Sequence, residues 1–126
     1  MSARTLGDPM MVGLFRAEVE THAATLNAGL LAMEKNPAGT GEVASLMRAA
    51  HSVKGAARIV NIEMAVRLAH AMEDVFVGVQ SGAVVLDSEK IDVLLEGADT
   101  LARIGQLAAD ETYDDLMGLA ETATGL

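Results

Sequence analysis

The stretch Arg48-Ala49-Ala50-His51-Ser52-Val53-Lys54-Gly55-Ala56-Ala57-Arg58 lies within a longer segment whose apolar residues recur at helical spacing. Residues three and four apart share a face of a helix. The polar residues therefore form one stripe: His51, Lys54, Gly55 and Arg58. The stripe beside it is apolar and suited to burial: Val43, Leu46, Met47, Ala50, Val53, Ala57 and Val60. Glycine in a helix interior costs up to about 1 kcal/mol relative to alanine. We therefore expect something to approach the backbone at Gly55.

Composition favours a single all-α domain. The chain has 126 residues, enough for one domain with its own core. Hydrophobic residues make up 51% of it, but aromatic residues only 2%, and there is no tryptophan. The core must therefore consist of Ala, Leu, Val, Ile and Met, which suits close helix packing. Only two prolines occur, and β-branched residues do not form alternating runs. We expect one domain over residues 1–126.

Charge and cysteine content exclude several classes of protein. The formal net charge is −9, whereas a nucleic-acid-binding protein needs a basic face to neutralise phosphates. The absence of cysteine excludes disulfides, thiolate catalysis and cysteine metal sites. No apolar run approaches the roughly 20 residues that a membrane-spanning helix requires, and the N-terminus lacks the layout of a signal peptide. We expect a cytoplasmic protein with no membrane insertion.

Helix start and stop signals divide the chain into helices joined by short connections. Asp8-Pro9 is typical of a helix start, and the cluster Asn36-Pro37-Ala38-Gly39 predicts its end. Further helices are expected from Thr40 or Gly41 to about Val60, from Ile62 to about Ser81, from Glu89 to about Leu107 and from Tyr113 to about Ala123. Residues 84–86 are expected to pack onto the end of the bundle. The sequence thus predicts an antiparallel four-helix bundle with an additional C-terminal helix, ordered over about residues 8–123.

The chain has three histidines, His22, His51 and His70. A single histidine on a helix is usually a surface residue or a satisfied core residue, and we interpret His22 in this way. The second and third helices are consecutive and join at a turn near Asn61. His51 precedes that turn by ten residues, while His70 and Glu73 follow it by nine and twelve. In an antiparallel pair these residues lie at one height, so we predict a cluster of His51, His70, Glu73 and Lys54.

This cluster suits reversible phosphorylation on nitrogen. A nucleophilic imidazole must present an unprotonated nitrogen, and a carboxylate that accepts a hydrogen bond from the other ring N–H fixes the tautomer. Glu73 is the best candidate for that carboxylate. Lys54 can neutralise phosphoryl oxygens as a point charge, and His70 can donate a further hydrogen bond.

Two other readings remain open from the residues alone. Ferritin-like metal sites need Glu-x-x-His pairs, but Val19, Arg48 and Arg67 stand three residues before the histidines. Zinc at His51, His70 and Glu73 is the remaining metal-binding alternative, although Lys54 would oppose the cation. In the other reading the bundle is a non-catalytic interaction module with an incidental polar network.

Two segments resemble the histidine phosphotransfer (HPt) domain at the N-terminus of CheA-type histidine kinases: Ala50-His51-Ser52-Val53-Lys54-Gly55-Ala56-Ala57 and Leu68-Ala69-His70-Ala71-Met72-Glu73-Asp74. The similarity extends over nearly the whole chain, including the Ser81-Gly82 exit and the leucine-rich fourth helix. The runs at residues 30–37 and 47–60 are similar to the Wsp-type, CheA-like hybrid kinases of surface-sensing pathways. One departure is Asn61, where the family often has glycine. Asparagine tolerates left-handed backbone conformations, so we expect the turn to survive.

The resemblance implies a role for each site residue. His51 is the phosphorylated residue, Glu73 hydrogen-bonds it, and Lys54 and His70 support the site. Gly55 lets a partner approach, and we assign docking to it together with Ser52 and Arg58.

The resemblance also implies partners. His51 would take a phosphoryl group from a histidine kinase catalytic domain and pass it to an aspartate of a response-regulator receiver domain. The chain has no Gly-x-x-x-x-Gly-Lys-[Ser/Thr] loop, so we expect no cofactor in this domain and ATP and Mg²⁺ on the partners. The domain then has no complete active site of its own. We expect a monomeric domain that forms the N-terminal part of a longer kinase in chemotaxis-like signalling.

Overall fold

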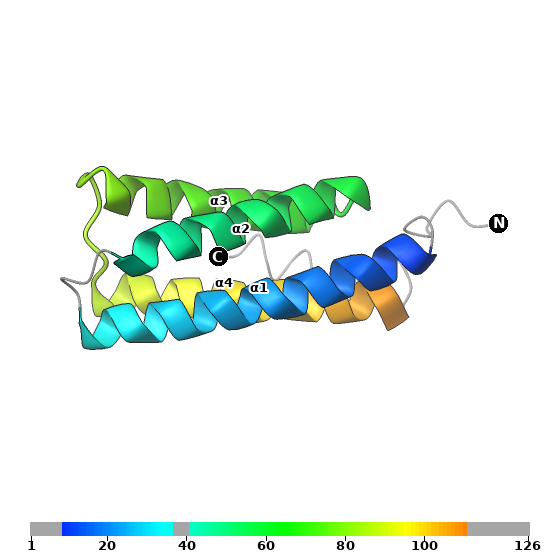
Figure 1. Cartoon of the computed structure of the whole chain (residues 1–126), viewed down its shortest axis with the longest axis horizontal. Coiled ribbons are helices and arrows are strands. Elements are labelled where there is room, and N and C mark those ends of the chain that lie inside the picture. The colour runs from blue at the N-terminus through cyan, green and yellow to red at the C-terminus, as the bar shows by residue number, and fades with distance from the viewer. Residues whose placement is uncertain (1–8, 37–40, 111–126) are drawn as a thin grey trace.

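The structure, a computed structural model, describes residues 9–36 and 41–110. Four helices run antiparallel to their chain neighbours: α1 (Pro9–Lys35), α2 (Gly41–Ile59), α3 (Glu63–Gln80) and α4 (Ser88–Asp110) (Figure 1). Every described element is helical, which confirms the all-α bundle. The predicted C-terminal helix at 113–123 lies outside the described residues, as do residues 37–40 between α1 and α2.

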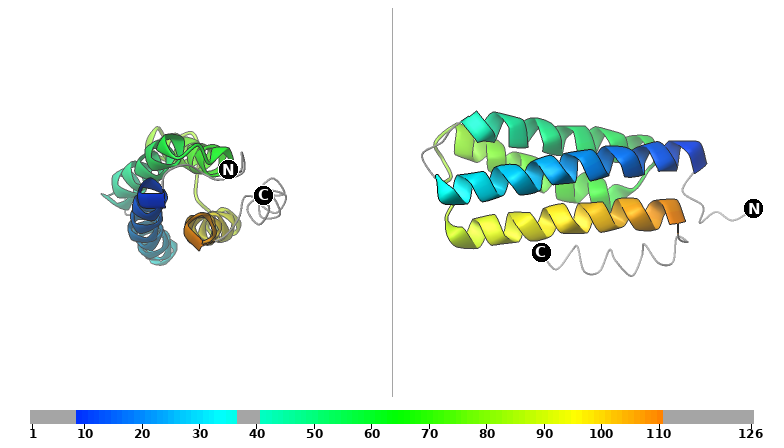
Figure 2. Two further views of the ribbon diagram at one scale, coloured as in Figure 1. Left: turned by 90° about the vertical axis from the view of Figure 1, so that its right-hand side faces the viewer. Right: turned by 60° about the horizontal axis from the view of Figure 1, so that its bottom comes forward.

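Helix order around the bundle places α2 between α1 and α3. Seen end-on, the helices follow the order α3, α2, α1, α4 (Figure 2). The contacts are dense for α2 with α3, for α1 with α2 and for α1 with α4, and they are sparser between α3 and α4. The second helix therefore has one long side against α3, another against α1, and a third that is free to face outward.

The core is aliphatic, as the composition requires. Its largest fully buried side chains come from all four helices: Phe15, Val19, Leu26, Leu30, Leu46, Val53, Phe76, Leu101 and Ile104. Alanines at positions 49, 50, 57, 65 and 69 are buried as well. These small residues let α2 and α3 approach closely, so that polar side chains can meet across their outer edges. No described residue with a polar or charged side chain is buried.

The turn between α2 and α3 is set by Asn61. Its backbone has a φ of 57°, and the Ile62 N–H donates to the Ala57 carbonyl at 3.1 Å. This hydrogen bond is typical of a helix that ends with a residue in the left-handed conformation. The α3 end is built in the same way, with Gly82 at a φ of 84° and the Ala83 N–H donating to the Gly78 carbonyl at 2.9 Å. The left-handed conformation expected of Asn61 is confirmed, and it fixes the register of α2 against α3.

The fourth helix differs from the sequence prediction at its end. The Asp87 carboxylate caps its start by accepting from the Lys90 N–H at 2.8 Å, and this hydrogen bond lowers the pKa of Asp87. The helix continues to Asp110 rather than ending at about Leu107. Of the three apolar residues expected to pack on the bundle end, Leu86 is buried and Val84 is half-buried, but Val85 is exposed. A three-residue connection can turn only some of its side chains inward.

No helix among the described residues is both long enough and apolar enough to cross a membrane.

Candidate functional site

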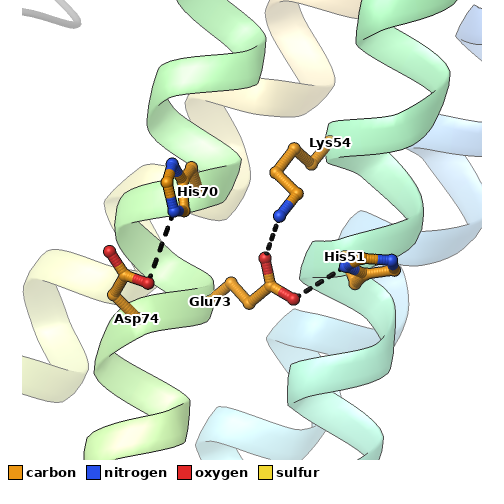
Figure 3. Close-up of polar contacts among 5 residues, drawn as sticks. All are labelled: His51, Lys54, His70, Glu73 and Asp74. Atoms are coloured by element: carbon orange, nitrogen blue, oxygen red, sulfur yellow. Dashed lines mark hydrogen bonds and ion pairs between the residues drawn. The ribbon is translucent and has the colours of Figure 1, made fainter.

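The imidazole of His51 and the carboxylate of Glu73 meet across the outer edge of α2 and α3. His51 Nδ1 lies 2.8 Å from Glu73 Oε2 (Figure 3). The two residues come together because they stand at nearly equal distances from the Asn61 turn on antiparallel helices, and each helix rises about 1.5 Å per residue. The His51 side chain is 68% exposed, whereas that of Glu73 is 15% exposed. The imidazole therefore faces outward over a sheltered carboxylate.

Lys54 holds the other oxygen of the same carboxylate. Its ammonium donates to Glu73 Oε1 at 2.6 Å, and its side chain is 13% exposed. Lys54 follows His51 by three residues, so both side chains lie on the edge of α2 that faces α3. Each oxygen of Glu73 thus has its own partner, and the three side chains form a single polar network.

The network determines the protonation state of Glu73. Partial burial by itself raises the pKa of a carboxyl, but hydrogen bonds from Lys54 and His51 and the charges of both groups outweigh burial. The pKa of Glu73 is lowered as a result. Glu73 is therefore a carboxylate near neutral pH and accepts hydrogen bonds without donating any.

The ionised carboxylate assigns the tautomer of His51. Because Glu73 only accepts, the proton of the neutral imidazole lies on Nδ1 and the lone pair lies on Nε2. Nε2 has no partner among the described residues, and the ring is mostly exposed. Unprotonated Nε2 is a nucleophile that an incoming electrophile can reach. This is the chemistry that the sequence predicted for His51.

Gly55 has an open surface. A Cβ atom built on Gly55 would meet no other atom within 4 Å. Packing within the described domain therefore does not require glycine here. Arg58 is exposed and Ser52 is half-exposed on the same outer side of α2. The structure thus leaves the three predicted docking residues accessible, and their docking role stays a prediction.

His70 lies on α3 close to the network but is turned toward another residue. Its Nε2 lies 3.5 Å from Asp74 Oδ1, and both side chains are largely exposed (Figure 3). The contacts of the described residues place it with Asp74 rather than with His51, so the hydrogen bond expected from His70 to the site is not formed in this structure. The i,i+4 spacing of His70 and Asp74 was the signal for this pairing.

The metal-binding alternative needed His51, His70 and Glu73 to converge. The described residues contain no group of three or more His, Asp or Glu side chains placed to hold a metal ion. Lys54 occupies one oxygen of Glu73, and His70 points away toward Asp74. His22 pairs with Glu18 at 3.0 Å on α1, in keeping with its interpretation as a satisfied residue.

Comparison with known proteins identifies the class of protein that this bundle and its outward histidine represent. Residues 10–110 match the family model described as "Hpt domain". Because the match covers most of the chain, the protein belongs to the Hpt domain family, whose members serve histidine phosphotransfer in two-component signalling.

The chain is similar to one part of larger proteins. It is 32% identical over 110 residues to the chemotaxis protein CheA of Halobacterium salinarum. That alignment covers 86% of this chain and 16% of the relative. It is 30% identical over 95 residues to CheA of Treponema pallidum, covering 75% of this chain and 12% of that protein. The resemblance to CheA-type kinases is thereby confirmed, although the chain spans less than a fifth of these relatives.

A solved structure has the same fold. The phosphorylated P1 domain of CheA3 in complex with CheY6 from R. sphaeroides superimposes with a TM-score of 0.74 at 24% sequence identity. The match covers 94% of this chain and 98% of that one. At this identity the likeness shows the fold.

Proposed function

We propose that His51 accepts a phosphoryl group on Nε2 and then passes it to an aspartate of a receiver domain. The observation that carries this proposal is the 2.8 Å contact between His51 Nδ1 and the Glu73 carboxylate beneath an exposed ring. It holds the proton on one nitrogen and leaves the lone pair of the other nitrogen in solvent. A buried or oppositely protonated ring could not serve in this way.

The donor is ATP bound to a histidine kinase catalytic domain. The Nε2 lone pair attacks the γ-phosphorus, the N–P bond forms as the bond from the γ-phosphorus to the β,γ-bridging oxygen breaks, and the electron pair of that bond leaves with ADP. As positive charge develops on the imidazole, the Glu73 carboxylate stabilises it through the Nδ1 proton. The Lys54 ammonium, which is bonded to Glu73 Oε1, adds positive charge near the reacting ring, and this charge favours an anionic phosphoryl group there. ATP and Mg²⁺ belong to the kinase partner and enter only as its substrate and metal.

The acceptor is a carboxylate of a receiver domain. Support comes from the P1 domain of CheA3, which has this fold and whose structure was solved in complex with CheY6. In this second step a carboxylate oxygen attacks the phosphorus, the P–N bond breaks and its electron pair returns to Nε2. The imidazole is then neutral again and ready for another cycle.

The relatives support a kinase context for the chain. They include proteins named CheA and a sensor histidine kinase CheAY of Helicobacter pylori, which is 29% identical over 76 residues. We propose that the chain works in the cytoplasm as the monomeric phosphoacceptor domain of a CheA-like kinase of the Wsp type. Such a domain supplies the nucleophile and the docking surface, while its partners supply nucleotide and metal.

The test uses phosphoramidate, a small-molecule phosphoryl donor, and separately a CheA-type kinase with ATP. We expect one acid-labile, alkali-stable phosphoryl group per chain, found on His51 by mass spectrometry. His51→Gln should abolish labelling, while His22→Gln and His70→Gln serve as matched controls that keep it. Equal labelling of the His51→Gln variant would refute the proposal.

A further inference from the structure

The polar network beside His51 has no spare positive charge for a phosphoryl group. The Lys54 ammonium donates to Glu73 Oε1 at 2.6 Å, and the two side chains are only 13% and 15% exposed. One ammonium beside one carboxylate leaves no net charge. A phosphoryl group on His51 adds negative charge and three acceptor oxygens, on a chain whose net charge is already −9. A second cation on the exposed side of the ring would stabilise that group.

Arg48 lies one helical turn before His51 on α2. Residues three apart on a helix are neighbours, with Cβ atoms about 5–6 Å apart. Lys54, His51 and Arg48 follow one another at this spacing, and each step turns about 60° around the helix axis. Lys54 lies at the end of this row that contacts α3 through Glu73, so Arg48 lies at the other end. His51 therefore has a cation on each side.

The reacting nitrogen of His51 is on the side of the ring that faces away from α3. Nδ1 lies against Glu73, and Figure 3 shows the other ring nitrogen directed away from α3. Arg48 is exposed and lies about 160° around α2 from Leu46, which is fully buried. Arg48 therefore faces outward on the side of α2 toward which Nε2 is directed, and its long side chain can reach a phosphoryl group there.

The guanidinium of Arg48 has no competing partner in the part of the chain that the structure describes. It forms no ion pair with any described residue. The positions one turn away on its own helix, 44, 45, 51 and 52, hold Ala, Ser, His and Ser, so no carboxylate is at the spacing of a helical ion pair. Arg67 on α3, by contrast, lies 3.6 Å from Glu63 at such a spacing. Arg48 is therefore available to an anion that arrives at His51.

We propose that Arg48 binds the phosphoryl oxygens during phosphorylation of His51 and in the phosphorylated product. This inference rests on the proposed function and deepens it. As the bond from Nε2 to phosphorus forms and the bond to the leaving group breaks, the guanidinium donates N–H groups to two of the phosphoryl oxygens. Glu73 stabilises the positive charge on the ring, and Arg48 stabilises the negative charge on the transferred group. Arg48 is in this sense a catalytic residue of the domain.

The other polar residues near His51 are less suited to this contact. Arg58 follows His51 by seven residues, which is about 10 Å along α2. His70 lies 3.5 Å from Asp74 on its own helix, and the charge of Lys54 is balanced by Glu73. On α2, Arg48 is the arginine within one turn of the reacting ring.

The first experiment measures phosphorylation without a protein partner. The donor is phosphoramidate, whose P–N bond breaks as the bond to Nε2 forms, and the electron pair of that bond leaves with the nitrogen as ammonia. We expect Arg48→Gln to slow labelling of His51 about tenfold, which corresponds to about 1.4 kcal/mol. Arg48→Lys should recover part of the rate, because lysine keeps the charge but not the two-pronged geometry.

The matched control is Arg103→Gln, which removes an exposed arginine from α4. It changes the net charge by the same amount as Arg48→Gln, and we expect it to be labelled as fast as the unchanged chain. Circular dichroism and urea unfolding of all variants show whether each is folded, so that a slow rate can be assigned to the site.

The second experiment detects the contact in the phosphorylated product. A cation close to the phosphoryl oxygens favours the fully ionised group. The ³¹P NMR signal of phosphorylated His51 should therefore titrate at higher pH in Arg48→Gln than in the unchanged chain, and Arg103→Gln should titrate like the unchanged chain. The difference should become smaller at about 0.5 M salt, because exposed charges are then screened within a few ångströms. A merely structural role of Arg48 would not move this titration.

Several outcomes would overturn the role of Arg48. These are labelling of Arg48→Gln within twofold of the unchanged chain, an unchanged ³¹P titration, or an equal loss of rate in Arg103→Gln. A defect seen only with a kinase and ATP would assign Arg48 to kinase docking and would also overturn the proposal. In each of these cases His51 is still labelled in the unchanged chain. Absence of label on His51 in the unchanged chain would instead refute the proposed function, and the role of Arg48 with it.

Discussion

Replacement of Glu73 by glutamine tests the central contact of the site. Glutamine keeps the shape of the side chain but removes its charge, so it no longer requires the Nδ1 proton of His51 and no longer neutralises Lys54. A hydrogen bond to a charged group contributes about 1.5–3 kcal/mol. If that interaction is fully expressed as positive charge develops on the imidazole, its loss slows phosphorylation by about 10- to 150-fold, since about 1.4 kcal/mol corresponds to a factor of ten.

Stability should change much less than reactivity. The Glu73 side chain is 15% exposed and its partner Lys54 13% exposed, so the variant leaves a partly sheltered ammonium with a neutral acceptor. We expect a loss of about 1 kcal/mol, which corresponds to a decrease in Tm of about 4 °C for a domain of this size.

The assay follows two quantities in the same samples. The rate of His51 phosphorylation by phosphoramidate is measured by mass spectrometry, and the imidazole tautomer is measured by ¹⁵N NMR. The unchanged chain should show the proton on Nδ1, and Glu73→Gln should show a mixture of tautomers with slower labelling. A phosphorylation rate of Glu73→Gln within threefold of that of the unchanged chain would refute the reasoning, and so would a Nδ1-phosphorylated product of the unchanged chain.

Four further predictions concern the charge of Lys54, two helix glycines, the Asn61 turn and the pH dependence of stability. Lys54→Met keeps the apolar stem but removes the ammonium, so we expect slower labelling by the kinase with ATP and a circular dichroism spectrum like that of the unchanged chain; equal labelling would contradict the role of the charge. Gly55→Ala should raise the free energy of unfolding by about 0.5–1 kcal/mol in urea titration. Gly29→Ala should raise it less, because the added Cβ would lie 2.7 Å from Leu46 Cδ2. Asn61→Ala should lower the free energy of unfolding by about 1 kcal/mol, since it places alanine at a φ of 57°. Asn61→Gly should not lower it, because glycine adopts this conformation readily. Because the pKa of Glu73 is lowered in the fold, the stability that its ionised form contributes is present above the unfolded-state pKa and is lost as pH falls through the folded-state pKa. The unchanged chain should therefore unfold at higher urea than Glu73→Gln near neutral pH, and this difference in unfolding free energy should vanish in acid.

The helices and the central pair were accessible to sequence reasoning because they depend on local rules. Apolar spacing gives the buried faces of α1 to α4, and short connections make neighbours antiparallel. Counting residues from the Asn61 turn then places His51 opposite Glu73, which the structure confirms at 2.8 Å. The same count put His70 at the site as well, because spacing fixes the height of a residue but not the partner that its side chain chooses.

The partner of each side chain depends on which charged groups, on its own helix and on neighbouring helices, lie within its reach. His70 meets Asp74 one turn along its own helix at 3.5 Å, while Lys54 reaches across to Glu73. The extension of α4 to Asp110 is of the same kind, since a helix end without a strong stop signal is set by the packing of its last turns.

The amino-acid sequence by itself determined the class of fold, the antiparallel order and the height of His51 on the bundle, since each follows from periodicity and turn chemistry within a few residues. Tertiary structure alone decided which oxygen of Glu73 each partner takes and which nitrogen of His51 is free. It also decided that α2 packs against α3 on one side and against α1 on the other. These properties depend on distances between side chains of different helices, and no spacing within a single helix specifies them.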